Sequence, residues 1–244
     1  MVLTKSQLKV YRTAYNRLID DVEAAHERLE RDPGHIETIR GALRIIKDYN
    51  ANDYLGLFLL HRHFRCLTGS LFVERRYTPR KGHASVLVTK GEPAGDAGAR
   101  IAPHRFAIAS DGTVQPLEFT TDATVMTVYR RFSANAQLAR DVGLYFDQRG
   151  VSSMLGLGIY VRTGTMGKAT SVFLEETLHK NRSSVVHVLP QLPHEIGRAI
   201  PTLWTFGDNA FGCCNGQCIA YCNHSGIGLG YCGHRKTGSH MVCV

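Results

Sequence analysis

Residues 103–119, PHRFAIASDGTVQPLEF, carry the pattern on which the predicted fold class rests. Apolar and polar side chains alternate on both sides of Asp111-Gly112, a residue pair that favours the tight turn of a β-hairpin. A second hairpin is predicted just before it, because SLFVERRYT (70–78) and HASVLVTK (83–90) alternate in the same way on either side of PRKG. The middle of the chain is therefore expected to form antiparallel strands.

The first part of the chain has a helical period instead. Apolar side chains recur every three or four residues from 8 to 29, which predicts one long helix, and a second helix is expected after the stop signal at 32–34. These two helices are expected to form a hairpin. A third helix is predicted over YLGLFLLHRHF (54–64), with Asp53 as its N-cap.

The remaining main body is expected to combine one further long helix with more strands. Helical character returns at about 123–147, with Gly150 just beyond its end. MLGLGIYVRT (154–163), KATSVFLEET (168–177) and SSVVHVLP (183–190) each predict a strand. Helices with a mostly antiparallel sheet predict the α+β class rather than a parallel βαβ array. No internal repeat is recognised.

A change of composition near residue 203 predicts two domains. Residues 1–202 are expected to form the main α+β domain, helical over 1–66 and mixed over 67–202. Residues 203–244 are rich in Gly, Cys and His, and six of the seven cysteines lie between Cys213 and Cys243. Such a tail buries little apolar surface, so it needs metal, cross-links or docking on the main domain to become ordered.

The tail contains the donor types that suit a metal ion. Three cysteines are spaced four residues apart, which puts them on one face if the segment is helical. Two Cys-x-His elements follow, separated by a Gly-rich run that allows the chain to fold back. Thiolate with imidazole favours zinc, with copper or iron as alternatives. The predicted ligands are Cys214, Cys218, Cys222, His224, Cys232 and His234.

Other interpretations of the cysteines stay open. They could form disulfides in a secreted protein, or include a redox or nucleophilic thiol. A catalytic metal would also recruit an acid or a base from the main domain. The candidate carboxylates are Glu118, Asp122, Glu175 and Glu176, of which the last two should point to opposite faces of a strand. His63 and Cys66 could form a thiolate–imidazolium pair on the predicted third helix, although a buried structural thiol is the simpler reading.

Charge suggests a second type of binding surface. The formal net charge is +8 and the isoelectric point about 9.2. Much of this excess lies in residues 61–90, where basic and aromatic side chains are interleaved. That composition suits a nucleic acid or an acidic protein partner. The cations proposed to contact such a partner are Arg62, Arg65, Arg75, Arg76, Arg80 and Lys81.

These features lead to one main functional hypothesis. We expect a metal-binding protein with a C-terminal zinc site, which either orders the tail or serves an enzyme acting on a small molecule. The first 21 residues lack the apolar core of a secretory signal, so a cytoplasmic location is expected. No segment approaches the roughly 18 apolar residues of a membrane span, so no membrane partner is expected. Whether the protein is an enzyme is left open, because no phosphate loop, GxSxG or HExxH motif occurs.

Overall fold

A computed structural model describes residues 3–77, 86–97, 100–161, 172–189, 197–198, 200–205, 217–223, 232–233, 236–237 and 240–241. The α+β class is confirmed. The helices are α1 (Lys5–Asn16), α2 (Val22–Glu30), α3 (His35–Asp48), α4 (Ala123–Ser133), α5 (Ala136–Gln148) and the short 3-10 helix η1 (His179–Asn181). The first strands are β1 (Leu55–Leu59), β2 (Ser70–Tyr77), β3 (Val86–Pro93), β4 (Ala102–Ile108), β5 (Val114–Thr120), β6 (Leu155–Ile159), β7 (Val172–Leu178) and β8 (Ser183–Leu189). They are followed by β9 (Gly197–Arg198), β10 (Ile200–Thr205), β11 (Gln217–Asn223), β12 (Cys232–Gly233), β13 (Lys236–Thr237) and β14 (His240–Met241).

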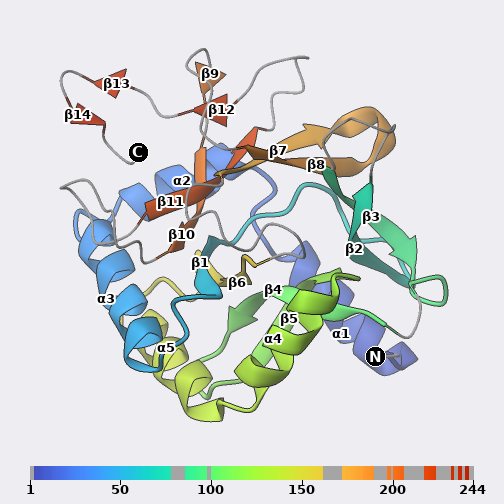
Figure 1. Cartoon of the computed structure of the whole chain (residues 1–244), viewed down its shortest axis with the longest axis horizontal. Coiled ribbons are helices and arrows are strands. Elements are labelled where there is room, and N and C mark those ends of the chain that lie inside the picture. Colours follow the sequence, from blue (N-terminus) through green and yellow to red (C-terminus); the bar gives the residue numbers. More distant parts are fainter. Residues whose placement is uncertain are drawn as a thin grey trace.

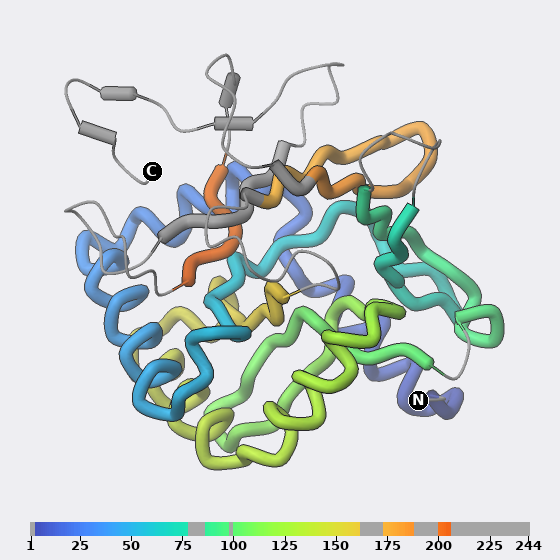
Figure 2. The backbone as a smooth tube through the Cα atoms, viewed as in Figure 1, coloured from blue at the N-terminus to red at the C-terminus, as the bar shows by residue number. Residues whose placement is uncertain are grey.

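Ten of these strands form a closed barrel, in the order β1-β10-β11-β7-β8-β3-β2-β5-β4-β6. Helices α3 and α5 lie side by side and, with α2 and α4, cover β1, β4, β6 and β10 through a shared apolar core (Figure 1). Helix α1 packs elsewhere, against β2 and β5. The hairpins β2–β3 and β7–β8 meet through the pairing of β3 with β8 (Figure 2). Closure leaves no free edge among the ten strands.

The two predicted hairpins in the middle of the chain are confirmed. Strands β2 and β3 pair from Ser70 opposite Pro93 to Tyr77 opposite Val86. Strands β4 and β5 pair across a turn in which Gly112 has a φ of +85°, a conformation that glycine adopts without steric cost. The three strands predicted after residue 150 are also present, as β6, β7 and β8.

The helical predictions need three corrections. The segment 54–64 is not a third helix, because it contains β1, a central strand whose five residues are all buried between β6 and β10. The predicted helix over 8–29 is two helices, and Asp21 caps the start of the second. The predicted helix over 123–147 is also divided, because the Asn135 side chain accepts a hydrogen bond from the Leu138 amide and starts α5.

The barrel has an internal twofold pseudosymmetry, so the expectation of no repeat is wrong. Strands β1 to β5 correspond to β6, β7, β8, β10 and β11, and the ring order is the same when the two sets are exchanged. Leu57 pairs with its own counterpart Leu157, and Val88 pairs with its own counterpart Val185. A pseudo-twofold axis therefore passes through these two pairs, in opposite walls of the barrel.

Local details repeat between the halves as well. Asn50 after α3 and Gly150 after α5 have positive φ angles of 53° and 68°, and matching turn hydrogen bonds lead from each into β1 or β6. Irregularities follow Pro103 in β4 and Pro201 in β10 at matching register positions. The sequences keep only short similarities, such as SLFVE at 70–74 and SVFLE at 171–175. Many different combinations of apolar side chains can fill the same buried face of a strand, so the fold repeats while the sequence diverges.

The boundary expected at residue 203 falls inside β10, a strand of the barrel. Strand β11, which lies within the predicted tail, pairs antiparallel with β10 and parallel with β7. The division of the chain into two domains stays a prediction. In the described part of the chain, no helix is both long enough and apolar enough to cross a membrane.

Candidate active site

A small cavity lies inside the barrel. Residues of seven barrel strands surround it, and its volume is about 30 Å³. Most of its wall is apolar, but four side chains with ionisable groups also line it: Glu74 from β2, His104 and Arg105 from β4, and Tyr160 just after β6. Room of this size holds about two water molecules or a group of two or three non-hydrogen atoms.

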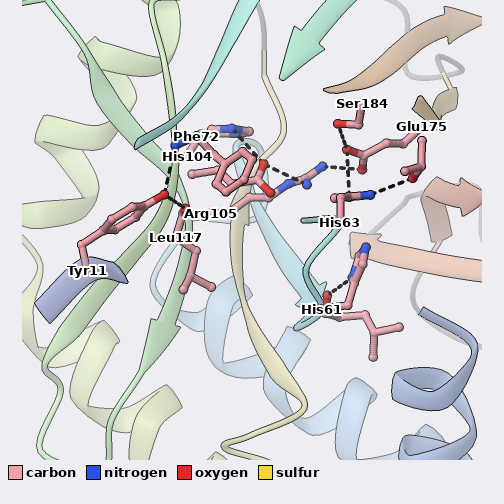
Figure 3. Close-up of polar contacts among 12 residues, drawn as sticks. Tyr11, His61, His63, Phe72, His104, Arg105, Leu117, Glu175 and Ser184 are labelled. Atoms are coloured by element: carbon pink, nitrogen blue, oxygen red, sulfur yellow. Dashed lines mark hydrogen bonds and ion pairs between the residues drawn. The ribbon is translucent and has the colours of Figure 1, made fainter. Parts of the chain in front are cut away.

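Arg105 is the centre of a buried charged cluster beside this cavity (Figure 3). Its Nη1 lies 3.0 Å from Oε2 of Glu118, and its Nη2 lies 3.0 Å from Oε2 of Glu175. The guanidinium carbon also lies 4.4 Å from the ring centroid of Phe58. The arginine side chain is 12% exposed and each carboxylate side chain 3% exposed. The guanidinium therefore holds together carboxylates from both halves of the barrel.

An irregularity in β4 places two consecutive polar side chains in the interior. The register with β5 shifts between Pro103 and Arg105 and again between Arg105 and Phe106. In a regular strand neighbouring side chains point to opposite faces, whereas a bulge re-aims one of them. His104 and Arg105 consequently both line the cavity. His104 Nε2 lies 3.7 Å from Oε2 of Glu118.

Glu175 is held by further contacts on its other oxygen (Figure 3). The hydroxyl of Ser184 donates to Oε1 of Glu175 at 2.7 Å, and Nε2 of His63 lies 3.2 Å from the same atom. The second ring nitrogen of His63, Nδ1, lies 2.9 Å from Oγ1 of Thr177. Thr177 pairs with Ser184 in the β7–β8 register, two residues from Glu175, so the three side chains share one face. The carboxylate is therefore fixed in position by three partners.

These surroundings shift the pKa values of the two glutamates in opposite directions. Burial raises the pKa of Glu118, and the nearby Glu175 adds to this, against the opposing charge of Arg105. Burial also opposes ionisation of Glu175, but the charges of Arg105 and His63 and hydrogen bonds from His63 and Ser184 outweigh it. They hold the pKa of Glu175 well below its usual range. Glu118 therefore binds a proton more readily than Glu175 does.

Glu74 adds a third buried carboxyl group. Its residue is 2% exposed, and its position in β2 corresponds to that of Glu175 in β7 under the pseudosymmetry. Negative charge on Glu74 contributes to raising the pKa of both Arg105 and Glu118. The interior therefore holds three carboxyl groups close to one guanidinium.

The thiolate–imidazolium pair considered for His63 and Cys66 is not formed. The Cys66 thiol contacts the carbonyl oxygens of Leu67 at 3.6 Å and Ser70 at 3.3 Å. Burial raises the pKa of this thiol to about 11, against a lowering by Arg12, so it stays protonated at neutral pH. Cys66 is a buried structural thiol. His63 instead belongs to the Glu175 network described above.

The other proposed carboxylates lie apart from the cavity. Glu176 points away from the cluster, as expected for the strand neighbour of Glu175, and its Oε2 lies 3.9 Å from Nε2 of His187. Asp122 is the N-cap of α4 and accepts from the amides of Thr124 and Val125. Glu118 and Glu175 are thus the two members of the predicted set that the fold brings together.

Part of the predicted metal ligand set lies in described strands. Cys218 and Cys222 lie in β11, so this segment is a strand and not the helix considered above. Their register partners in β10 are Trp204 and Ile200, and Cys222 also pairs with Glu175 of β7. Cys232 begins β12. Cys214, His224 and His234 lie outside the described residues, and among those described no group of three or more metal-binding side chains is placed to hold a metal.

Several cations of the basic segment are engaged in internal ion pairs. Nη2 of Arg62 lies 2.7 Å from Oδ2 of Asp20, and Arg75 forms two hydrogen bonds with Glu92, at 2.9 and 2.7 Å. Arg76 lies 3.9 Å from Asp122, and Arg65 is exposed. Arg80 and Lys81 lie outside the described residues.

Sequence reasoning missed the residues that complete this site, notably His104, Arg105, Thr177 and Ser184. A usable signal was present, because a single glutamate interrupts an otherwise apolar stretch in SLFVE, PLEF and VFLE. A carboxylate buried in a strand requires a partner, which directs attention to the arginine of the adjacent strand.

Comparisons of the chain with protein-family models, with curated proteins and with solved structures gave no match.

Proposed function

We propose that this protein is an enzyme that performs acid–base chemistry on a small molecule, of which one polar group of two or three non-hydrogen atoms enters the cavity of the barrel. The observation that supports this most strongly is the pair Glu118 and Glu175, held by one arginine at a cavity wall, with pKa values shifted in opposite directions. When the pKa values of two neighbouring carboxyl groups are shifted in opposite directions, one group can supply a proton while the other stays charged. Such perturbed groups beside a cavity are characteristic of functional sites.

Each residue of the cluster has a distinct proposed role. Glu118 holds the proton, and His104, which lies beside it and lines the cavity, passes that proton to or from the bound molecule. Glu175 stays ionised and fixes the guanidinium of Arg105, which is oriented toward both carboxylates. Ser184 and His63 fix Glu175 in turn. Glu175, Ser184 and His63 are therefore positioning residues in this scheme.

The test is turnover by purified protein of p-nitrophenyl acetate, phosphate and β-glucoside, as representatives of three hydrolytic classes. We expect turnover in one class that falls 10²- to 10⁴-fold, the range typical of a lost general acid, in Glu118→Gln. Activity should also fall as pH rises through the raised pKa of Glu118, because the proton is then lost. Glu176→Gln, which changes a carboxylate outside the cluster, is the matched control. Full turnover by folded Glu118→Gln would remove this proposal.

A second proposed function is zinc binding by the C-terminal segment. It is supported by the number of donors, because six cysteines and three histidines lie between residues 213 and 243 and four ligands suffice for one zinc. Cys218 and Cys222 lie four residues apart in a strand, roughly 13 Å along it, so they would belong to different ligand groups. The proposed ligand set remains Cys214, Cys218, Cys222, His224, Cys232 and His234. Thiolate and imidazole ligands favour zinc over magnesium or calcium.

Elemental analysis of freshly purified protein tests this second function. We expect about one or two zinc ions per chain, which are lost in chelator or at acid pH, because the ligands must be deprotonated to bind the metal. The double variant Cys218→Ser with Cys222→Ser should lose the metal, whereas Cys66→Ser, which changes the buried thiol of the barrel, should keep it. Metal-free wild-type protein with oxidised cysteines would exclude the site.

A further inference from the structure

The net positive charge of the chain comes almost entirely from three short segments. They are residues 3–19, which include α1, residues 63–69 of the loop between β1 and β2, and residues 178–182 at the turn between β7 and β8. These segments carry seven of the 29 Lys and Arg residues and none of the 21 Asp and Glu residues. They therefore account for seven of the eight net positive charges. Their cations are Lys5, Lys9, Arg12, Arg17, Arg65, Lys180 and Arg182.

The fold places the three segments side by side. The side chain of Asn16 in α1 donates to the carbonyl oxygen of Cys66 at 3.1 Å and accepts from its amide at 2.7 Å. Arg182 of the third segment donates to the carbonyl oxygen of Arg65 at 2.8 Å. Its guanidinium carbon also lies 5.6 Å from the ring centroid of Phe64. Three parts of the chain that are far apart in the sequence thus form one surface, which we name the basic surface.

One stripe of α1 carries cations along this surface. Lys5, Lys9 and Arg12 are spaced by four and three residues, so they lie on the same side of the helix. Arg12 donates to the hydroxyl of Thr68, and Asn16, the next residue of the stripe, is bonded to the same loop. The stripe therefore borders the loop. From Lys5 to Asn16 it is roughly 17 Å long at the helical rise per residue.

The cations of the basic surface are available to a partner. Six of the seven are exposed, and Arg12 is half-buried. Within the described residues none of the seven forms an ion pair with a carboxylate, whereas Arg62 and Arg75 do. One exposed acidic residue, Asp96, lies at the edge of the surface, in a turn whose backbone donates to Gly69 at 2.8 Å. Seven cations against one carboxylate give this face a positive potential, which attracts an anionic partner.

The aromatic side chains of the basic surface argue against single-stranded nucleic acid as that partner. Proteins that bind single strands irrespective of sequence stack the bases on aromatic side chains. Tyr11 and Tyr15 are buried in the core, and Phe64 is half-buried. The three segments, all of whose residues the structure describes, therefore present cations without an exposed aromatic platform.

The apolar side chains argue against a membrane surface. An interfacial helix buries an apolar face in the lipid and keeps its cations on the other face. The apolar face of α1 is already packed against the barrel through Tyr11 and Tyr15. Two exposed aliphatic side chains remain, Leu67 in the loop and Val10, which lies about 100° around α1 from Lys9. They do not form a continuous apolar face.

We propose that the basic surface binds the sugar–phosphate backbone of a nucleic-acid duplex, irrespective of base sequence. A duplex is a stiff rod with regularly spaced phosphates, and cations that neutralise these phosphates release condensed counterions. Arg65 is the one member of the cation set predicted from the sequence that belongs to this surface. The proposal rests neither on the acid–base cluster nor on the zinc proposed for the tail.

Fluorescence anisotropy of a labelled DNA duplex of about 20 base pairs, titrated with the full-length protein at several salt concentrations, tests this proposal. We expect a micromolar Kd at low salt. The logarithm of the association constant should fall against the logarithm of the salt concentration with a slope of about −4, which corresponds to four or five phosphate contacts. A single strand of the same length should bind more weakly. Absence of saturable duplex binding at low salt, or equal or tighter binding of the single strand, would overturn the proposal.

Cosedimentation with vesicles of phosphatidylcholine and phosphatidylserine distinguishes a lipid surface. We expect the protein to bind the duplex more tightly than the vesicles at the same salt concentration. Vesicle binding without duplex binding would assign the basic surface to anionic lipid and overturn the proposal.

Matched charge variants locate the binding surface. Arg17→Gln with Arg65→Gln should weaken duplex binding at least about tenfold at 0.1 M salt and make the salt slope shallower by about 1.8, because two phosphate contacts are lost. Arg44→Gln with Arg140→Gln is the control, since it removes two exposed arginines from α3 and α5, outside the basic surface, and changes the net charge equally. An equal effect of the two pairs would show that net charge alone drives binding and would overturn the proposal.

A second pair of substitutions tests the stripe of α1 separately. Lys5→Gln with Lys9→Gln should weaken binding and reduce the slope as much as the arginine pair does, since both lysines are exposed on one side of the helix. This pair also gives the test if the arginine pair fails to fold. Wild-type affinity and slope in the folded lysine variant would overturn the assignment of this surface.

Discussion

Arg105 and Leu203 occupy corresponding positions in the two halves of the barrel, yet one carries a charge and the other does not. The charge is tolerated because Glu118 and Glu175 lie within 3.0 Å of the guanidinium. Burial alone would lower the pKa of Arg105, but the two carboxylates outweigh it, so the arginine stays charged. Each member of the cluster depends on the others, because an unpaired buried charge is costly.

Replacing Arg105 with the leucine of the other half tests this dependence. Arg105→Leu leaves two buried carboxyl groups without their cation, so the free energy of unfolding should fall by about 3–5 kcal/mol at pH 7. The loss of unfolding free energy should be smaller at pH 4, because protonation of the two carboxyl groups then removes their charge. Arg131→Leu is the control, because its ion pair with Asp53 at 3.6 Å is exposed and contributes at most about 1 kcal/mol. Urea unfolding at pH 7 and pH 4 measures the free energy of unfolding. An equal loss at the two pH values would contradict the dependence of the carboxylates on Arg105.

The lowered pKa of Glu175 predicts how stability changes in acid. Its contribution is complete above the unfolded-state pKa of about 4.3 and is lost as pH falls through the lower folded-state pKa. Glu175→Gln should therefore be less stable than wild type at pH 6 and should lose less stability on acidification to pH 3. Equilibrium urea unfolding at several pH values between 3 and 6 gives the free energy of unfolding of each protein, and its slope against pH is then compared. A variant with the same acid slope as wild type would show that Glu175 titrates normally.

At the scale of elements, α1 has no counterpart among the described elements of the second half. It is joined to the barrel through Tyr11, whose hydroxyl donates to the carbonyl of Leu117 in β5 at 2.9 Å and accepts from the amide of Phe72 in β2 at 3.1 Å. These two strands pair in parallel over only Val73 and Glu74. The tyrosine hydroxyl therefore bridges the strands beyond the end of their short ladder.

The two tyrosines of α1 provide a matched pair of substitutions. Tyr11→Phe leaves a buried amide and a buried carbonyl without their partner, so it should lower the free energy of unfolding by about 1–3 kcal/mol. Tyr15→Phe removes a buried hydroxyl that has no hydrogen-bond partner within the described residues, so it should cost nothing or stabilise slightly. Chemical denaturation compares the two variants. Equal losses would mean that the hydroxyl bridge contributes nothing specific.

At the scale of the whole molecule, β11 closes the ring by joining β10 to β7. It lies after residue 203, within the segment expected from composition to be a separate tail. The Cys-rich region thus supplies a strand to the barrel that contains the acid–base cluster. Closure requires this strand, because without it β10 and β7 would each present an unpaired edge.

Two truncated chains test the contribution of β11. A chain ending at residue 205 lacks β11 and should fail to unfold cooperatively, and its exposed edges should make it aggregate. A chain ending at residue 225 keeps all ten strands of the ring and should retain a cooperative transition. Far-UV circular dichroism during thermal unfolding, together with size-exclusion chromatography, distinguishes them. Cooperative unfolding of the shorter monomeric chain would show that 1–205 is a domain by itself.

Local patterns in the sequence determined the α+β class and most of the strands. The hairpins β2–β3 and β4–β5 were predictable because alternation and an Asp-Gly turn are encoded by neighbouring residues. Segment 54–64 was not, because a buried central strand is apolar on both faces and loses the alternation that identifies a strand. Whether such a run becomes helix or strand depends on the partners β6 and β10, which come from distant parts of the chain.

Only the tertiary structure determined the pseudosymmetry and the site. Glu118 and Glu175 could be named from the sequence as carboxylates, but their shared partner Arg105 depends on a bulge in β4 and on ring closure. The cavity wall brings together residues such as Gly158 and Leu203, whose strands β6 and β10 are not neighbours in the ring. Sequence by itself specifies which faces can be buried, because that preference belongs to each residue. The pairing of distant strands decides which charged side chains lie together in the barrel interior. These side chains are far apart in the sequence and come together only when the barrel closes.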